Sequence, residues 1–163
     1  MARRLLLLPV FAALCLAVAG IARAVSTPEF IVTGRVYCDT CRAGFETSAT
    51  EYIEGAKVRL ECKHFDSGAV EHSVDGVTDK TGTYSIKLED NHEEEICEVV
   101  LVESPVADCS EVDAARSRAR VLLAQDSGLA SPLRYANPLG YLKTTPLHIC
   151  GALLKKYALG DDK

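Results

Sequence analysis

The sequence has 163 residues, with 18 lysines and arginines against 23 aspartates and glutamates, and its formal net charge is −5. This length suits one domain with a modest hydrophobic core. The acidic balance argues against nucleic acid and anionic membranes as partners, because both bind a basic surface.

Residues 1–24 have the pattern of a secretory signal peptide. Arg3 and Arg4 precede an apolar run over 5–21, and Ala22-Arg23-Ala24 supplies the small-x-small pattern that signal peptidase recognises. An uncleaved membrane anchor is the alternative, but a run of 17 residues lies at the lower end of the spanning range. We therefore expect cleavage after Ala24, no membrane insertion, and one secreted, extracellular domain over 25–163.

Short segments of alternating apolar and polar residues follow the leader, and turn residues separate them. Alternation with a period of two is typical of half-buried strands. The inward faces that it predicts are Phe30, Val32, Val36 and Cys38; Val58, Leu60 and Cys62; Tyr84, Ile86 and Leu88; and Cys97, Val99 and Leu101. Asp75-Gly76 is a strong hairpin signal, and Thr81-Gly82 predicts a second turn. The pattern predicts an all-β fold, an antiparallel sandwich or barrel.

The last third of the chain has weaker signals. Ser110 lies three residues before Asp113, which is compatible with a helix cap. Ala119, Val121 and Leu123 also alternate with arginines, and we favour a strand from about Arg118 with a turn at Ser127-Gly128. Residues 148–160 are expected to form a short helix or an irregular coil that Cys150 holds in place.

Removal of the leader changes two counts. It takes away Cys15 and three arginines, which leaves 15 basic against 23 acidic residues, a net charge of −8, and an even number of cysteines. The six cysteines are Cys38, Cys41, Cys62, Cys97, Cys109 and Cys150. An even count in an exported chain of this size predicts three disulfides.

The Cys38-x-x-Cys41 unit could also belong to a redox enzyme or a zinc site. A thioredoxin-type site requires the first cysteine at a helix N-terminus, whereas Cys38 ends a predicted strand. A zinc site requires a second pair of ligands at close spacing, and the histidines are scattered at His64, His72, His92 and His148. We therefore expect structural disulfides, with no metal and no cofactor.

Three motifs carry a family resemblance. "GRVYCDTCR" (34–42), "DCSE" (108–111) and "NPLGYL" (137–142), with six cysteines in this order, closely resemble the Ole e 1-like pollen protein family. This family includes olive, plantain and grass pollen allergens and extracellular proteins of the pollen tube. The resemblance implies a β-barrel or sandwich of about seven strands. It also implies three disulfide bonds, Cys38–Cys109, Cys41–Cys150 and Cys62–Cys97.

The same resemblance implies a function. It indicates a monomeric, non-enzymatic pollen protein, a potential allergen, which acts in hydration, germination or pollen-tube growth through an extracellular protein partner such as a receptor-kinase ectodomain. A carrier with a small apolar ligand inside the barrel is the alternative. An enzyme is disfavoured, because no catalytic motif surrounds any serine.

Three surface features have two interpretations each. The acidic segment 89–98, with one histidine, could bind calcium, but it lacks the spacing of a calcium loop and is expected to be a solvated hairpin tip. A basic stripe is formed by Arg116, Arg118 and Arg120. It could bind an acidic partner, or its charges could prevent an exposed sheet edge from pairing with another chain. Asn91 and Asn137 both fail the glycosylation sequon, so we expect no N-linked glycan.

Overall fold

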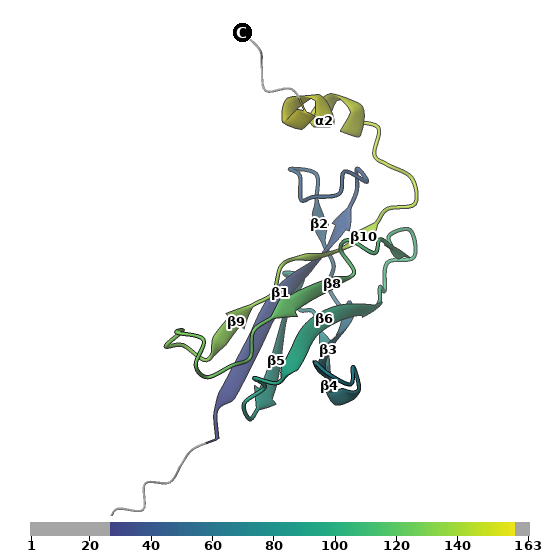
Figure 1. Cartoon of the computed structure of the whole chain (residues 1–163). Coiled ribbons are helices and arrows are strands. Elements are labelled where there is room, and N and C mark those ends of the chain that lie inside the picture. Colours follow the sequence, from purple (N-terminus) through teal and green to yellow (C-terminus); the bar gives the residue numbers. More distant parts are fainter. Residues whose placement is uncertain (1–26, 159–163) are drawn as a thin grey trace, which may run out of the picture.

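The computed structural model describes residues 27–158, so the expected signal peptide and its cleavage site lie outside the described residues. In this part of the chain two β-sheets pack against each other, and one helix follows them at its C-terminal end (Figure 1). The elements are β1 (Glu29–Asp39), β2 (Glu51–Tyr52), β3 (Lys57–His64), β4 (Val70–Val77), β5 (Thr83–Glu89), β6 (Glu95–Glu103), β7 (Glu111–Val112), β8 (Arg118–Val121), β9 (Leu133–Tyr135), β10 (Leu139–Leu142) and α2 (Cys150–Ala158). Seven of these strands have four residues or more, and the other three are shorter.

The first sheet is built around the long strand β1. Its first half lies between β5 and β9, and its second half lies between β2 and β10, while β7 pairs with the far side of β10. The pairing of β1 with β9 and with β10 is parallel. The prediction of a purely antiparallel fold is therefore wrong for this sheet, because the chain returns to β1 from a long connection and not through a hairpin.

The second sheet is antiparallel, with the order β4-β3-β6-β8. Its alternation follows the predicted pattern: Val58, Leu60 and Cys62 are buried, and the residues between them are exposed or half-buried. The core between the two sheets combines the inward faces of both. Over the described residues the two sheets remain separate and do not join into a closed barrel, so the sandwich alternative describes the fold.

The predicted hairpin at Asp75-Gly76 is wrong, because both residues lie inside β4. The turn falls at Asp79–Gly82, where the Asp79 carboxylate accepts hydrogen bonds from the backbone N–H groups of Thr81 (2.8 Å) and Thr83 (3.1 Å). Gly76 serves packing: a Cβ there would lie 2.7 Å from Ile86 Cγ1. The glycine thus allows β4 to approach β5, which closes one side of the sandwich.

The later third follows the favoured predictions. Residues 118–121 form a strand with Ala119 and Val121 buried, and the segment after Ser110 forms no helix. The tail forms the short helix α2, which begins at Cys150. Among the described helices, none has the length and apolarity needed to cross a bilayer.

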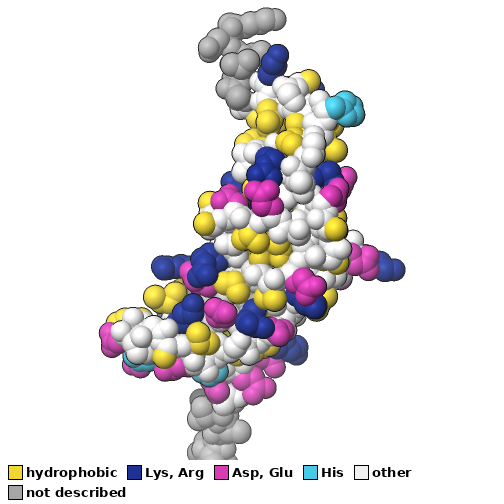
Figure 2. All heavy atoms as spheres, turned by 90° about the vertical axis from the view of Figure 1, so that its right-hand side faces the viewer, with side chains coloured by type: hydrophobic (Ala, Val, Ile, Leu, Met, Phe, Trp, Pro, Cys, Tyr) yellow, Lys and Arg dark blue, Asp and Glu magenta, His cyan; other side chains and the backbone are white. Residues whose placement is uncertain are grey.

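Charges of both signs are mixed on the surface. Figure 2 shows acidic and basic side chains next to one another on one face, with hydrophobic groups between them. Exposed ion pairs join neighbouring strands, as in Lys57–Glu103 (2.7 Å) and Arg59–Asp75 (2.6 Å). Such pairs contribute little to stability, but they keep the outer face of β3 polar.

Candidate functional site

Two disulfides fasten the end of the sandwich where β1 terminates. Cys38, at the end of β1, is bonded to Cys109, and Cys41, three residues later, is bonded to Cys150 at the start of α2. The third bridge joins Cys62 on β3 to Cys97 directly opposite on β6. These are the three pairs that the family resemblance implies. The Cys-x-x-Cys unit thus holds two later segments, one through each cysteine.

The loop between these two cysteines and the chain beyond them is organised by Asp39. Its carboxylate is buried and accepts three backbone N–H bonds, from Cys41 (3.2 Å), Ala43 (3.0 Å) and Gly44 (2.7 Å). Arg42 within this loop has a positive φ of 51°. The carboxylate therefore holds the backbone in a conformation that few non-glycine residues adopt.

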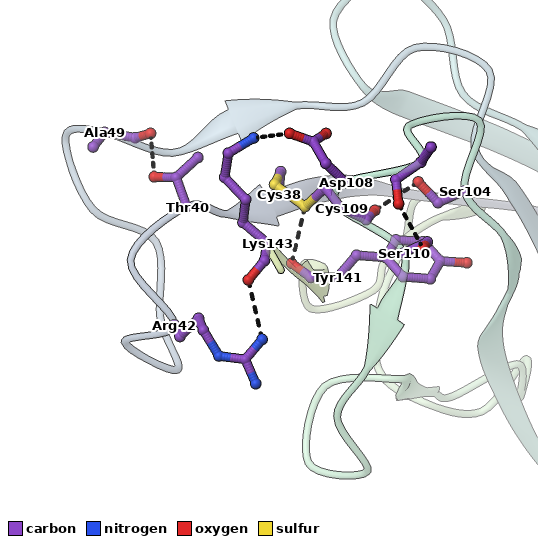
Figure 3. A network of polar contacts seen from close by, with 11 residues as sticks. Cys38, Thr40, Arg42, Ala49, Ser104, Asp108, Cys109, Ser110, Tyr141 and Lys143 are labelled. Carbon is purple, nitrogen blue, oxygen red and sulfur yellow. Dashed lines mark hydrogen bonds and ion pairs between the residues drawn. A yellow bond between two sulfur atoms is a disulfide. The ribbon is translucent and has the colours of Figure 1, made fainter. Parts of the chain in front are cut away.

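Charged side chains connect this loop to the segments that the disulfides bring in. Arg42 donates two hydrogen bonds to Glu111, at 2.6 and 2.7 Å, and Lys143 donates to Asp108 at 2.5 Å. Arg42 also donates to the backbone carbonyl of Lys143 at 3.0 Å (Figure 3). The hydrogen bond from Arg42 lowers the pKa of Glu111, and that from Lys143 lowers the pKa of Asp108. In these two ion pairs each cation is matched by one carboxylate, and the pairs link segments that the two disulfides hold.

A different surface lies on the side of the sandwich where β8 and β9 are the edge strands. A groove of about 630 Å³ runs between them, and it is open to solvent. Its apolar lining includes exposed side chains, namely Leu122 (60 % exposed), Leu129 (57 %) and Tyr135 (77 %). We call this surface the β8–β9 groove. Exposed apolar side chains that gather in a groove are a common feature of binding sites.

A buried arginine also lines the groove. Arg134 on β9 is 5 % exposed, and its guanidinium donates to the carbonyl oxygens of Leu122 (3.0 Å), Ala124 (3.4 Å) and Ser131. It also lies 5.0 Å from the centre of the Phe30 ring. Among the described residues no carboxylate forms an ion pair with it; its partners are the carbonyl oxygens, the Ser127 hydroxyl, which accepts a hydrogen bond at 3.2 Å, and the aromatic face.

The three predicted surface arginines have different environments. Arg118 and Arg120 point outward from β8 and both pair with Glu98, at 2.6 and 3.3 Å. Arg120 lines the β8–β9 groove, and its side chain is 75 % exposed. Arg116 turns the other way and donates to the Tyr37 hydroxyl at 2.9 Å. All three arginines therefore have partners within the protein, and Arg120 is the one that also lines the groove.

The acidic segment 89–98 is not a purely solvated tip. His92 is 2 % exposed, and it contacts Glu95, as does His72 on β4. Burial acts to raise the pKa of the Glu95 carboxyl, but the two neighbouring histidines outweigh burial and lower this pKa. Sequence reasoning missed this cluster, because β4 and the loop after β5 meet only in the folded chain.

Comparison with known proteins identifies relatives along the described chain. The family model described as "Pollen protein Ole e 1 like" matches residues 28–158. The pollen-specific protein C13 of Zea mays is 62 % identical over 135 residues, which is 83 % of this chain and 79 % of that protein. The major pollen allergen Lol p 11 of Lolium perenne is 48 % identical over 131 residues, 80 % of this chain and 98 % of the allergen.

A solved structure has a similar fold. The crystal structure of the major plantain pollen allergen Pla l 1 superimposes with a TM-score of 0.66 at 33 % identity, and the match covers 73 % of this chain and 97 % of the allergen. The family match therefore spans both sheets and both disulfides at the end of β1. This chain belongs to the Ole e 1-like family of pollen proteins.

Proposed function

We propose that this protein is a secreted, non-enzymatic component of pollen that binds an extracellular protein partner during hydration, germination or pollen-tube growth. The ectodomain of a receptor kinase is the partner that we favour. Relatives that are named as pollen-specific proteins and pollen allergens support the setting. All six cysteines of the described chain are paired in disulfides, which suits the oxidising extracellular space.

The β8–β9 groove is the observation that carries the proposal. β8 is the last strand of its sheet, so one of its edges bonds to no strand among the described residues. An extended segment of a partner can add to such an edge through backbone hydrogen bonds. The apolar side chains of Leu122 and Leu129 would cover its apolar residues, and Arg120 with the buried Arg134 favours acidic ones.

The carrier alternative has less support. Side chains fill the space between the two sheets, and Tyr84, Tyr141 and Leu139 are among those that are fully buried there. A small apolar ligand would have to bind in the surface groove and not in an enclosed interior. We therefore retain the protein partner as the proposed ligand.

The test uses the secreted, disulfide-bonded protein with a fluorescent label. We expect saturable binding to pollen-tube surfaces and to purified receptor-kinase ectodomains expressed in pollen. The substitution Leu122→Asp should weaken this binding at least tenfold. Val77→Asp is the matched control, because Val77 is 59 % exposed, close to the 60 % of Leu122, but lies on β4.

The outcomes separate the two parts of the proposal. Absence of saturable binding by the unmodified protein would contradict the proposed function. Binding that Leu122→Asp and Val77→Asp leave equally intact would contradict the assignment of the groove and leave the partner hypothesis standing.

A further inference from the structure

Three side chains with metal-binding atoms converge at the end of the sandwich opposite the two disulfides of β1. His72 comes from β4, His92 from the loop after β5, and Glu95 is the first residue of β6. Figure 1 shows these strand ends together at the lower end of the molecule. His72 pairs in register with Cys62, and Glu95 lies two residues before Cys97, so period two directs both side chains to the inner face with those buried cysteines.

The hydrogen bonds of His92 fix the position of its ring proton. Its Nε2 atom lies 2.8 Å from the carbonyl oxygen of Glu89. A carbonyl oxygen only accepts, so Nε2 carries the hydrogen and donates it. In the neutral ring, Nδ1 then has a free lone pair. A histidine that donates one ring N–H to a backbone carbonyl and directs the other nitrogen at a ligand position is typical of metal-binding histidines.

That lone pair points at a carboxylate. His92 Nδ1 lies 3.2 Å from Glu95 Oε1, and His72 Nδ1 lies 3.1 Å from Glu95 Oε2. A lone pair and a carboxylate oxygen repel each other unless a positive centre lies between them. A proton or a metal cation can serve, and two imidazoles with one carboxylate form a donor set that zinc commonly uses.

The distances and the burial agree with a metal ion. Ligand atoms at about 2.0–2.1 Å from a tetrahedral zinc lie about 3.3 Å from one another. The separations of Glu95 from His92 (3.2 Å) and from His72 (3.1 Å) are close to this value. The side chains of His92 and Glu95 are 1 % and 9 % exposed, whereas that of His72 is 42 % exposed. A metal ion can therefore enter past the half-exposed ring of His72, and water can occupy the remaining coordination position of the metal.

The neighbouring sulfur atoms do not act as thiolate ligands. Cys62 and Cys97 have Sγ atoms near the donors of His92 and Glu95, with all four within 4.8 Å of one another. Their disulfide removes the negative charge that a thiolate would bring. The Cys62–Cys97 disulfide therefore lies next to the cluster and holds β3 against β6 there.

We propose that His72, His92 and Glu95 form a binding site for a divalent cation of the Zn²⁺ type. The proposal departs from the expectation of no metal ligands, which rested on spacing along the sequence. It is independent of the β8–β9 groove and of the proposed partner. Calcium and magnesium are excluded by the donor set, because both prefer oxygen ligands.

The test uses the oxidised, secreted protein after dialysis against EDTA. We expect native mass spectrometry and titration calorimetry to show one Zn²⁺ per chain, with no binding of Ca²⁺ or Mg²⁺. Cobalt in place of zinc should give the visible absorption bands of a tetrahedral site. His72→Ala and Glu95→Gln should each lower the affinity at least tenfold.

Two controls make the result specific. His148→Ala and Glu94→Gln alter an exposed histidine and an exposed glutamate outside the cluster, and they should leave zinc affinity unchanged. His72 is half-exposed, so His72→Ala retains the fold, and circular dichroism verifies this. Absence of bound zinc in the unmodified protein, or equal binding by His72→Ala and His148→Ala, would overturn the proposal.

Discussion

Arg116 Nη1 donates a hydrogen bond to the Tyr37 hydroxyl at 2.9 Å and so joins the segment before β8 to the end of β1. Burial raises the pKa of Tyr37, and Arg116 opposes this shift. Tyr84 presents a contrast: its hydroxyl is buried, faces Gly34, and has no hydrogen-bond partner among the described residues. Two buried tyrosines therefore have hydroxyl groups in opposite situations: that of Tyr37 has a hydrogen-bond partner, and that of Tyr84 has none.

The first prediction uses this contrast. Tyr37→Phe should lower the free energy of unfolding by about 1.5–3 kcal/mol, because it removes a charge-assisted hydrogen bond and leaves a partly buried donor of Arg116 unpaired. Tyr84→Phe should be neutral or slightly stabilising, because it removes a hydroxyl that gains nothing from burial. Urea unfolding of both variants measures the difference. An equal loss in both would contradict the assigned roles.

The second prediction concerns the loop behind the Cys-x-x-Cys unit. Asp39→Ala should destabilise the protein by about 3 kcal/mol or more, because three backbone N–H groups, one in a buried hydrogen bond and two in partly buried ones, lose their acceptor. Asp39→Asn keeps one acceptor oxygen and should lose less. Thermal unfolding with the disulfides intact gives the ranking, and equal melting temperatures for both variants and the unmodified protein would refute it.

The third prediction is an alkaline transition. Burial raises the pKa of Tyr141 to about 12 and raises that of Tyr84 further. The unfolded chain ionises tyrosine near pH 10, so the neutral phenols contribute stability that is complete below about pH 10 and is lost as the pH rises through the folded pKa values. Tyrosinate absorbance and circular dichroism should therefore change together above pH 10. Ionisation of all tyrosines without loss of structure would argue against this.

The fourth prediction tests the close approach of β4 and β5. Gly76→Ala should cost about 1–3 kcal/mol, because the new methyl group would overlap Ile86. Gly151→Ala is the matched control: its Cβ would meet nothing within 4 Å, and alanine favours the helix in which it lies. Chemical denaturation of the two variants should give opposite signs, and a tolerated Gly76→Ala would show that β4 can move away.

The sequence predicts the inward faces of the long strands correctly because alternation is a local property. Leu60 and Ile86, for example, are buried as predicted, and each could be assigned from its immediate neighbours. The sequence predicts a turn at Asp75-Gly76, although both residues lie in β4. The reason for the glycine is not local, because Ile86, the side chain that it makes room for, lies in the next strand. β2, β7 and β9 have two or three residues each and are too short to show a period.

The candidate sites were less predictable than the fold. The arginine pattern correctly indicated the edge strand β8, but the groove also requires Leu129, from the segment that leads into β9, and Arg134 on β9 itself. The cluster of His72 and His92 had one local signal, a His-x-x-Glu spacing shortly before Cys97. The decisive second histidine lies 20 positions earlier in the sequence and approaches only when β4 pairs with β3.

The parallel pairing of β1 has a consequence for biosynthesis. Among the strands of residues 27–158, β1 is the first to leave the ribosome, yet its neighbours β9 and β10 are the last two to be made. The partner cysteine of Cys41 is later still, at the start of the terminal helix. The first sheet therefore cannot be completed until residue 142 has been made, and a shorter nascent chain keeps a hydrophobic strand with one open edge, which chaperones would have to shield.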